Sequence, residues 1–140
     1  MTLFIDTSAL VKRYVRERGR ELVINAMATD PVWCASAIAR TETQLVLHRI
    51  AMSRKEQAAL WSRFRDDWDA IASVPVDSRL LVRATEIGAQ YGVTTTDAIH
   101  LASADRLPRP IQFLTFDSHQ IPAAMALGLD VVSPGDTEPD

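Results

Sequence analysis

The chain begins with Met1-Thr2-Leu3-Phe4-Ile5-Asp6-Thr7-Ser8-Ala9-Leu10, and this stretch decides the fold. Its unbroken apolar run from Leu3 to Ile5 is typical of a short strand buried on both faces of a parallel sheet. The run stops at Asp6, and the side chains of Thr7 and Ser8 can cap a following helix. The pattern predicts a strand-to-helix turn with a carboxylate at the carboxyl end of the strand, where open α/β sheets bind ligands. Taken alone, Asp6 is explained equally well as a helix cap.

Further along the chain, short apolar runs alternate with amphipathic stretches. Strands are expected at 32–35, 74–76, 112–115 and 129–132, and long helices at 36–52, 53–71 and 78–91. Alternating strands and helices predict a three-layer α/β/α fold, in which a parallel sheet is sandwiched by helices. A length of 140 residues fits one domain, placed here at 1–133. The polar stretch 134–140 is expected to be a loose C-terminal tail.

Composition excludes several classes of protein. With 47% hydrophobic and 24% charged residues, the chain is not of the disordered type. A net charge of −3 argues against a passive nucleic-acid coat, although not against an enzyme that contacts nucleic acid briefly. The single cysteine excludes an internal disulfide framework. We find neither a signal-peptide pattern nor an apolar stretch long enough for a bilayer, so we expect a cytoplasmic protein with no membrane partner.

Two more acidic residues, and one histidine, lie at informative positions on the expected helices. Glu42 lies between Ile38 and Leu45 on the apparent apolar face of its helix, where a carboxylate is costly unless it is paired or bound to a cation. A salt bridge, for example to Arg49, is the plainer explanation. Asp97 stands in the first turn of a helix, where the helix dipole alone would favour it. His100, with no second histidine nearby, is interpreted as structural.

Asp117 follows the expected strand at 112–115 just as Asp6 follows the first strand. Right-handed crossovers bring the carboxyl ends of parallel strands to one edge of the sheet. Asp6, Glu42, Asp97 and Asp117 are therefore expected to converge. At an effective dielectric of about 20, two such charges about 4 Å apart repel by about 4 kcal/mol, so a divalent cation would relieve the cluster.

Oxygen ligands without a cysteine or histidine cluster suit Mg²⁺ or Mn²⁺. Such an ion activates water and stabilises charge on a phosphate, which indicates phosphodiester hydrolysis by direct attack of water. The sequence offers no serine–histidine or cysteine–histidine pairing for covalent catalysis. It also lacks the Gly-rich loop of nucleoside triphosphate sites.

The ordered set of motifs resembles the PIN domain, and within it the VapC-type toxins of bacterial toxin–antitoxin pairs. The matching stretches are 3–10, Glu42, 96–102, 113–117 and 127–134. The resemblance implies a five-stranded parallel sheet and a magnesium-dependent endoribonuclease with catalytic acids at Asp6, Glu42, Asp97 and Asp117.

In the roles we assign, Asp6 and Asp97 contact the main metal ion, and Asp117 assists or holds a second ion. Glu42 orients or deprotonates water. The resemblance also implies a nearby hydroxyl from Thr7 or Ser8, a homodimer, an RNA substrate and a small cognate antitoxin that blocks the site.

Other functions fit the sequence less well. A phospho-receiver domain needs a lysine after a late strand, and 114–118 contains none. A haloacid-type phosphatase needs a second aspartate where Ser8 stands. The alternative of a different class is a catalytically silent PIN-like module that binds RNA or a partner protein. The aromatic residues Trp61, Phe64 and Trp68 are interpreted mainly as core, with partner packing as a second use.

Overall fold

Five parallel strands form one sheet in the computed structural model, which describes residues 1–134. The order across the sheet is β3-β2-β1-β4-β5, so the first strand lies at its centre. The strand bounds are β1 Thr2–Ile5, β2 Val32–Ser36, β3 Ile71–Val74, β4 Ile111–Leu114 and β5 Asp130–Val132. The tail expected at 134–140 lies, apart from Pro134, outside the described residues.

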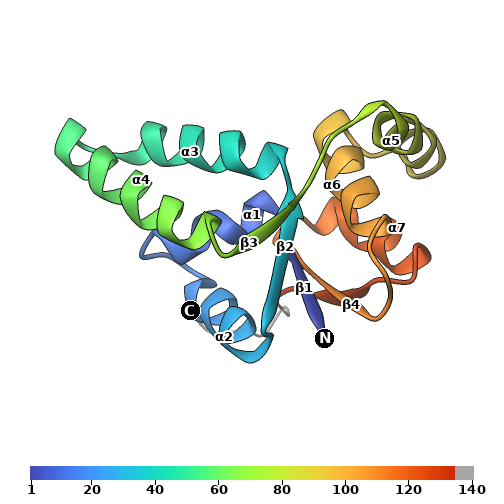
Figure 1. The fold of residues 1–140 in the computed structure, drawn as a ribbon, viewed down its shortest axis with the longest axis horizontal. Coiled ribbons are helices and arrows are strands. Elements are labelled where there is room, and N and C mark those ends of the chain that lie inside the picture. The colour runs from blue at the N-terminus through green and yellow to red at the C-terminus, as the bar shows by residue number, and fades with distance from the viewer. Residues whose placement is uncertain (135–140) are drawn as a thin grey trace.

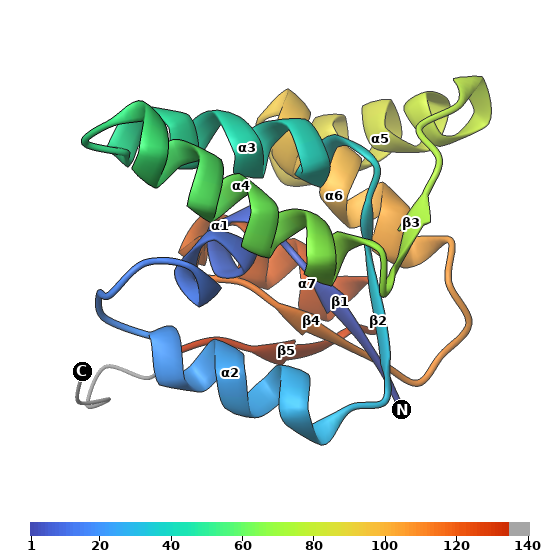
Figure 2. The same ribbon diagram turned by 60° about the vertical axis from the view of Figure 1, so that its left-hand side comes forward.

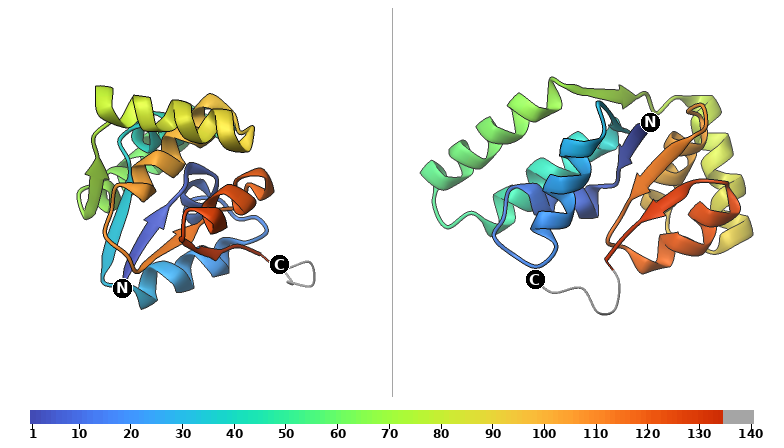
Figure 3. Two further views of the ribbon diagram at one scale, coloured as in Figure 1. Left: turned by 90° about the vertical axis from the view of Figure 1, so that its right-hand side faces the viewer. Right: turned by 90° about the horizontal axis from the view of Figure 1, so that it is seen from below.

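Helices cover both faces of this sheet, which confirms the α/β/α expectation (Figure 1). Helices α1 to α4 pack on one face and α5 to α7 on the other, as the view from below also shows (Figure 3). The helices are α1 Thr7–Leu10, α2 Arg20–Thr29, α3 Ile38–Ile50, α4 Arg54–Trp68, α5 Ser78–Tyr91, α6 Thr95–Asp105 and α7 Ile121–Ala126. Two short 3₁₀ helices are added, η1 Val11–Arg13 and η2 Ser118–Gln120.

The central strand β1 is buried on both faces, as its unbroken apolar run predicts. Leu3 and Ile5 belong to the core beneath α1 to α4, whereas Phe4 belongs to the core beneath α5 to α7. The Phe4 ring stacks on that of Phe113 in β4, with centroids 5.5 Å apart. This packing holds β1 and β4 in register, and Asp6 and Asp117 follow these two strands in the chain.

Two expectations about the helices are wrong in detail. Helix α4 ends at Trp68 rather than at 71, and β3 begins at Ile71 rather than at 74, because the apolar residue Ile71 is buried in the sheet instead of in the helix. The buried face of α3 consists of Ala39, Thr43 and Leu47 instead of the expected Ile38, Leu45 and Val46. Glu42 consequently lies at the border of the core, not inside it.

The aromatic residues of α4 mainly fill the interior. Phe64 is fully buried, and Trp61 and Trp68 pack against the same core. The indole nitrogen of Trp61 donates a hydrogen bond to the carbonyl of Gln44, 2.9 Å away, which joins α4 to α3. The two helices run side by side (Figure 2). These side chains are therefore core residues. Within residues 1–134, no helix is both long and apolar enough to span a membrane.

Candidate active site

Asp6 is at the centre of the candidate site. It follows β1 directly and caps α1, and only 3% of its surface is exposed. Its Oδ2 accepts hydrogen bonds from the Ser8 hydroxyl at 2.5 Å and from the Ser8 backbone N–H at 3.3 Å. The Ser8 hydroxyl oxygen in turn accepts the backbone N–H of Phe116 at 2.9 Å. Ser8 thus joins the turn after β1 to the segment after β4.

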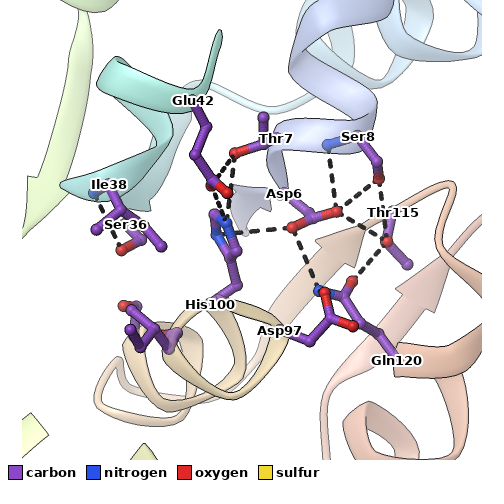
Figure 4. Close-up of polar contacts among 12 residues, drawn as sticks. Asp6, Thr7, Ser8, Ser36, Ile38, Glu42, Asp97, His100, Thr115 and Gln120 are labelled. Atoms are coloured by element: carbon purple, nitrogen blue, oxygen red, sulfur yellow. Dashed lines mark hydrogen bonds and ion pairs between the residues drawn. The ribbon is translucent and has the colours of Figure 1, made fainter. Parts of the chain in front are cut away.

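Asp97 lies in the first turn of α6 and shares a donor with Asp6. The Gln120 amide nitrogen donates to Asp97 Oδ1 at 3.0 Å and to Asp6 Oδ1 at 3.3 Å (Figure 4). The Asp97 backbone N–H is itself capped by the Thr94 hydroxyl. Burial raises the pKa of Asp97 above its usual range, and the charges of Asp117 and Asp6 raise it further. The negative charges of Asp97, Asp117 and Asp6 therefore lie close together at the start of α6.

Glu42 faces His100 and Thr7 on the other side of Asp6 (Figure 4). Its Oε1 accepts the Thr7 hydroxyl at 2.8 Å and lies 2.6 Å from His100 Nε2. Burial tends to raise the pKa of Glu42, but the bonds from His100 and Thr7 outweigh it and lower the pKa. The sequence suggested that Glu42 forms a salt bridge, for example to Arg49. In the structure its ion-pair partner is His100.

His100 is almost entirely buried, with 2% of its surface exposed. Burial alone would lower its pKa, but the Glu42 hydrogen bond and the charges of Asp6, Glu42 and Asp97 raise it. Its Nδ1 makes no hydrogen bond and lies 3.6 Å from Asp6 Oδ1. The imidazole therefore stands between two of the expected acids, which the interpretation as a merely structural histidine missed. Its spacing of three residues from Asp97 on α6 was the available signal.

Asp117 caps η2 after β4, and its Oδ1 accepts the His119 backbone N–H at 3.0 Å. Its own backbone N–H donates to the Thr115 hydroxyl at 3.0 Å. About 30% of its side chain is exposed, more than for Asp6. Its charge contributes to the raised pKa of Asp97, so the two carboxylates lie close enough to interact. Thr115 and Gln120, both fully buried, are the other polar residues that the sequence reasoning missed.

The polar groups fit a hard divalent cation, although no finished coordination shell is assembled. Within residues 1–134, no three His, Cys, Asp or Glu side chains stand together at the spacing of a bound metal. Asp6 and Asp97 nevertheless each direct one carboxylate oxygen toward the same point. The amide nitrogen of Gln120 occupies that point. Carboxylate oxygens are the ligands that Mg²⁺ and Mn²⁺ prefer. The donor chemistry therefore suits these ions.

A family model described as the PIN domain matches residues 3–133. The chain belongs to the PIN domain family. This PIN domain is 32% identical over 136 residues to Ribonuclease VapC46 of Mycobacterium tuberculosis, an alignment that covers 94% of this chain and 97% of the relative.

Solved structures share the fold. The FitAcB crystal structure from Neisseria gonorrhoeae has a TM-score of 0.69 at 17% identity, and covers 92% of this chain and 95% of its own. A toxin–antitoxin complex from Klebsiella pneumoniae has a TM-score of 0.68 at 20% identity, with 96% and 98% covered. The five-stranded PIN fold expected from the sequence is thereby confirmed.

Proposed function

We propose that this PIN domain is a metal-dependent endoribonuclease of the VapC toxin type that hydrolyses RNA in the cytoplasm. The observation that carries the proposal is the meeting of Asp6, Asp97 and Asp117 at one edge of the sheet, with Glu42 held beside them by His100. The identity to Ribonuclease VapC46 along nearly the whole chain supports RNA as the substrate.

Asp6 and Asp97 would hold the main metal ion, and Asp117 would assist them or hold a second ion. When bound, Mg²⁺ or Mn²⁺ supplies stabilisation of charge on the phosphate and a lowered pKa of coordinated water. Glu42 has a lowered pKa and is therefore ionised at neutral pH, so it can accept a hydrogen bond from the attacking water. The Thr7 hydroxyl and His100 keep the Glu42 carboxylate oriented, and the Ser8 hydroxyl does the same for Asp6.

A cleavage assay tests the proposal. The purified protein is expected to cut RNA with Mg²⁺ or Mn²⁺ and to stop in chelator, and Asp97→Asn should reduce cleavage to background. Asp130→Asn makes the same chemical change on the exposed edge strand β5 and should cleave normally. RNA binding without metal-dependent cleavage by the unaltered protein would favour the silent binding module instead.

The proposed partner is a small antitoxin that blocks the acidic site, acting on a homodimer of the toxin. Support comes from the solved neighbours, one of which is itself a toxin–antitoxin complex. An arginine from the antitoxin could form charge-assisted hydrogen bonds with the same carboxylates that would bind metal. Co-expression with the product of the adjacent gene should therefore yield a complex without nuclease activity. A complex that cleaves RNA as fast as the free protein would contradict this partner role.

A further inference from the structure

Gln120 is a fully buried polar side chain whose orientation is fixed by a hydroxyl group. The Thr115 hydroxyl lies 2.7 Å from Gln120 Oε1 and 3.2 Å from Asp6 Oδ2. It has one proton to donate, and the shorter contact assigns that proton to Gln120 Oε1. With the carbonyl oxygen occupied in this way, the amide nitrogen must point at Asp6 and Asp97, at 3.3 and 3.0 Å. The reverse orientation would place a carbonyl oxygen against two carboxylates, which electrostatic repulsion disfavours.

The amide nitrogen carries two N–H groups, and we assign one to each carboxylate because both oxygens lie within hydrogen-bond distance. The two N–H bonds diverge by about 120°, so contacts of this length hold the two acceptor oxygens roughly 5 Å apart. A Mg²⁺ ion lies about 2.1 Å from each ligand, which limits two oxygens on one ion to a separation of about 4 Å. With both Gln120 bonds intact, Asp6 Oδ1 and Asp97 Oδ1 are therefore too far apart to bind one ion directly together.

We propose that Gln120 is a positioning residue that takes the place of the metal ion between Asp6 and Asp97 until the ion binds. Its N–H groups relieve the repulsion between the two carboxylates in the metal-free protein. Metal binding then requires Gln120 to release at least one of them. This inference rests on the proposed function, since it concerns the same metal site.

The proposal predicts opposite effects on stability and on metal affinity. Gln120→Met keeps the size of the side chain but removes both N–H donors and the carbonyl acceptor. The metal-free variant should be less stable than wild type, because repulsion between Asp6 and Asp97 is no longer relieved. Its affinity for Mg²⁺ or Mn²⁺ should rise about tenfold or more, because no amide bond is broken on binding.

The experiment is a calorimetric titration of the wild-type protein and Gln120→Met with MgCl₂ and MnCl₂, paired with urea unfolding in chelator. Gln112→Met serves as the matched control, because it makes the same substitution in β4 at a half-buried position away from the carboxylates. Gln112→Met should leave metal affinity unchanged. Gln120→Asn provides a second variant if the methionine variant does not fold. Its amide is too short to bridge both carboxylates, so it should also tighten metal binding.

Tighter metal binding together with lower stability in chelator is the expected result. Lower stability with unchanged affinity would assign Gln120 a merely structural role and overturn the inference. Weaker binding would overturn it as well, because Gln120 would then orient the ligands for the ion. Failure of the wild-type protein to bind either ion would overturn the proposed function itself, and this outcome is read from the wild-type titration alone.

Discussion

Asp97 and Glu42 are both carboxylates of the candidate site, but their surroundings shift their pKa values in opposite directions. Burial and the charges of Asp117 and Asp6 raise the pKa of Asp97. A raised pKa in the folded state means a stabilising contribution at low pH that is lost as pH rises through that pKa. The ionised Asp97 therefore costs stability at neutral pH in the metal-free protein.

Asp97→Asn should consequently abolish cleavage while leaving the metal-free protein as stable as wild type or more stable. Asparagine keeps an oxygen that can accept the Gln120 N–H and gives up only a screened helix-dipole contribution of about 0.3–1 kcal/mol. Urea unfolding in chelator at pH 7 measures the effect. A clear loss of stability with normal cleavage would mean that Asp97 only supports the start of α6.

Glu42→Gln should also abolish cleavage but should destabilise the protein. The pKa of Glu42 is lowered because it pairs with the buried His100, and the amide cannot replace that charge. A hydrogen bond to a charged partner is worth about 1.5–3 kcal/mol, so a loss of about 1–2 kcal/mol is expected for this half-buried pair. The same unfolding experiment thus distinguishes the two acids: Glu42→Gln should lower the free energy of unfolding, whereas Asp97→Asn should leave it unchanged or raise it. Equal behaviour of both variants would contradict the assignment of different environments.

At the residue scale, the sequence pattern indicated the four acids as candidates but not the groups that contact them. Asp6 and Asp117 could be placed because Asp6 directly follows β1 and Asp117 comes three residues after β4, and strand ends are visible in the apolar pattern. Gln120 and Thr115 could not, because a lone glutamine or threonine next to a strand carries no spacing signal. His100 was misjudged because its partner Glu42 is 58 residues away in the chain.

At the element scale, helices α5 and α6 are joined by a clamp at one end. Asp77 caps α5 by accepting the Leu80 N–H at 2.9 Å, and Arg106, the C-cap of α6, donates to both Asp77 oxygens at 2.8 and 3.1 Å. The Arg106 bonds, followed by the Leu80 bond, lower the pKa of Asp77 to about 2. Helix α6 carries Asp97 at its other end, so the clamp fixes the direction of the helix that presents this acid.

This clamp predicts a pH-dependent stability difference between the wild-type protein and Asp77→Asn. A lowered pKa in the folded state gives stability that is present above the ordinary carboxyl pKa of 3.8 and lost as pH falls through about 2. Wild type should therefore exceed Asp77→Asn most at pH 6, with a difference that shrinks below pH 4. Urea midpoints at pH 6, 4 and 3 measure it. A pH-independent difference would show that only the cap, and not the ion pair with Arg106, matters.

Element type was easier to predict than element face. The strand-helix alternation predicted five strands, and four lie where short apolar runs between breakers placed them. The strand expected at 74–76 instead runs over Ile71–Val74, because its exposed residues Ala72 and Ser73 hide it in the apolar pattern. The prediction of the buried face of α3 was wrong because Leu45, although apolar, is 45% exposed, whereas the polar Thr43 is fully buried. Which side of a helix meets the sheet depends on the neighbouring α4, whose position the sequence of α3 does not contain.

At the scale of the whole molecule, the candidate site joins parts of the chain that are far apart in sequence. Asp6 follows the central strand β1, Asp97 lies in the first turn of α6 on one side of the sheet, and Asp117 follows β4. The unfolded chain cannot hold these three carboxylates together without paying the entropy of closing long loops. An ion that needs all three carboxylates therefore binds only the folded protein, and its binding stabilises the fold.

Mg²⁺ or Mn²⁺ should for this reason raise the melting temperature of the protein. A ligand at 100 times its dissociation constant stabilises the fold by about 2.7 kcal/mol, which corresponds to a shift on the order of 10 °C for a domain of this size. The shift should rise with the logarithm of metal concentration once the site is saturated. Sodium chloride of equal ionic strength is the control for screening. Asp97→Asn should show a much smaller shift because it removes one charged ligand. If metal and sodium chloride raise the melting temperature equally, the carboxylates at this edge are not a metal site, and hydrolysis by metal-activated water loses its basis.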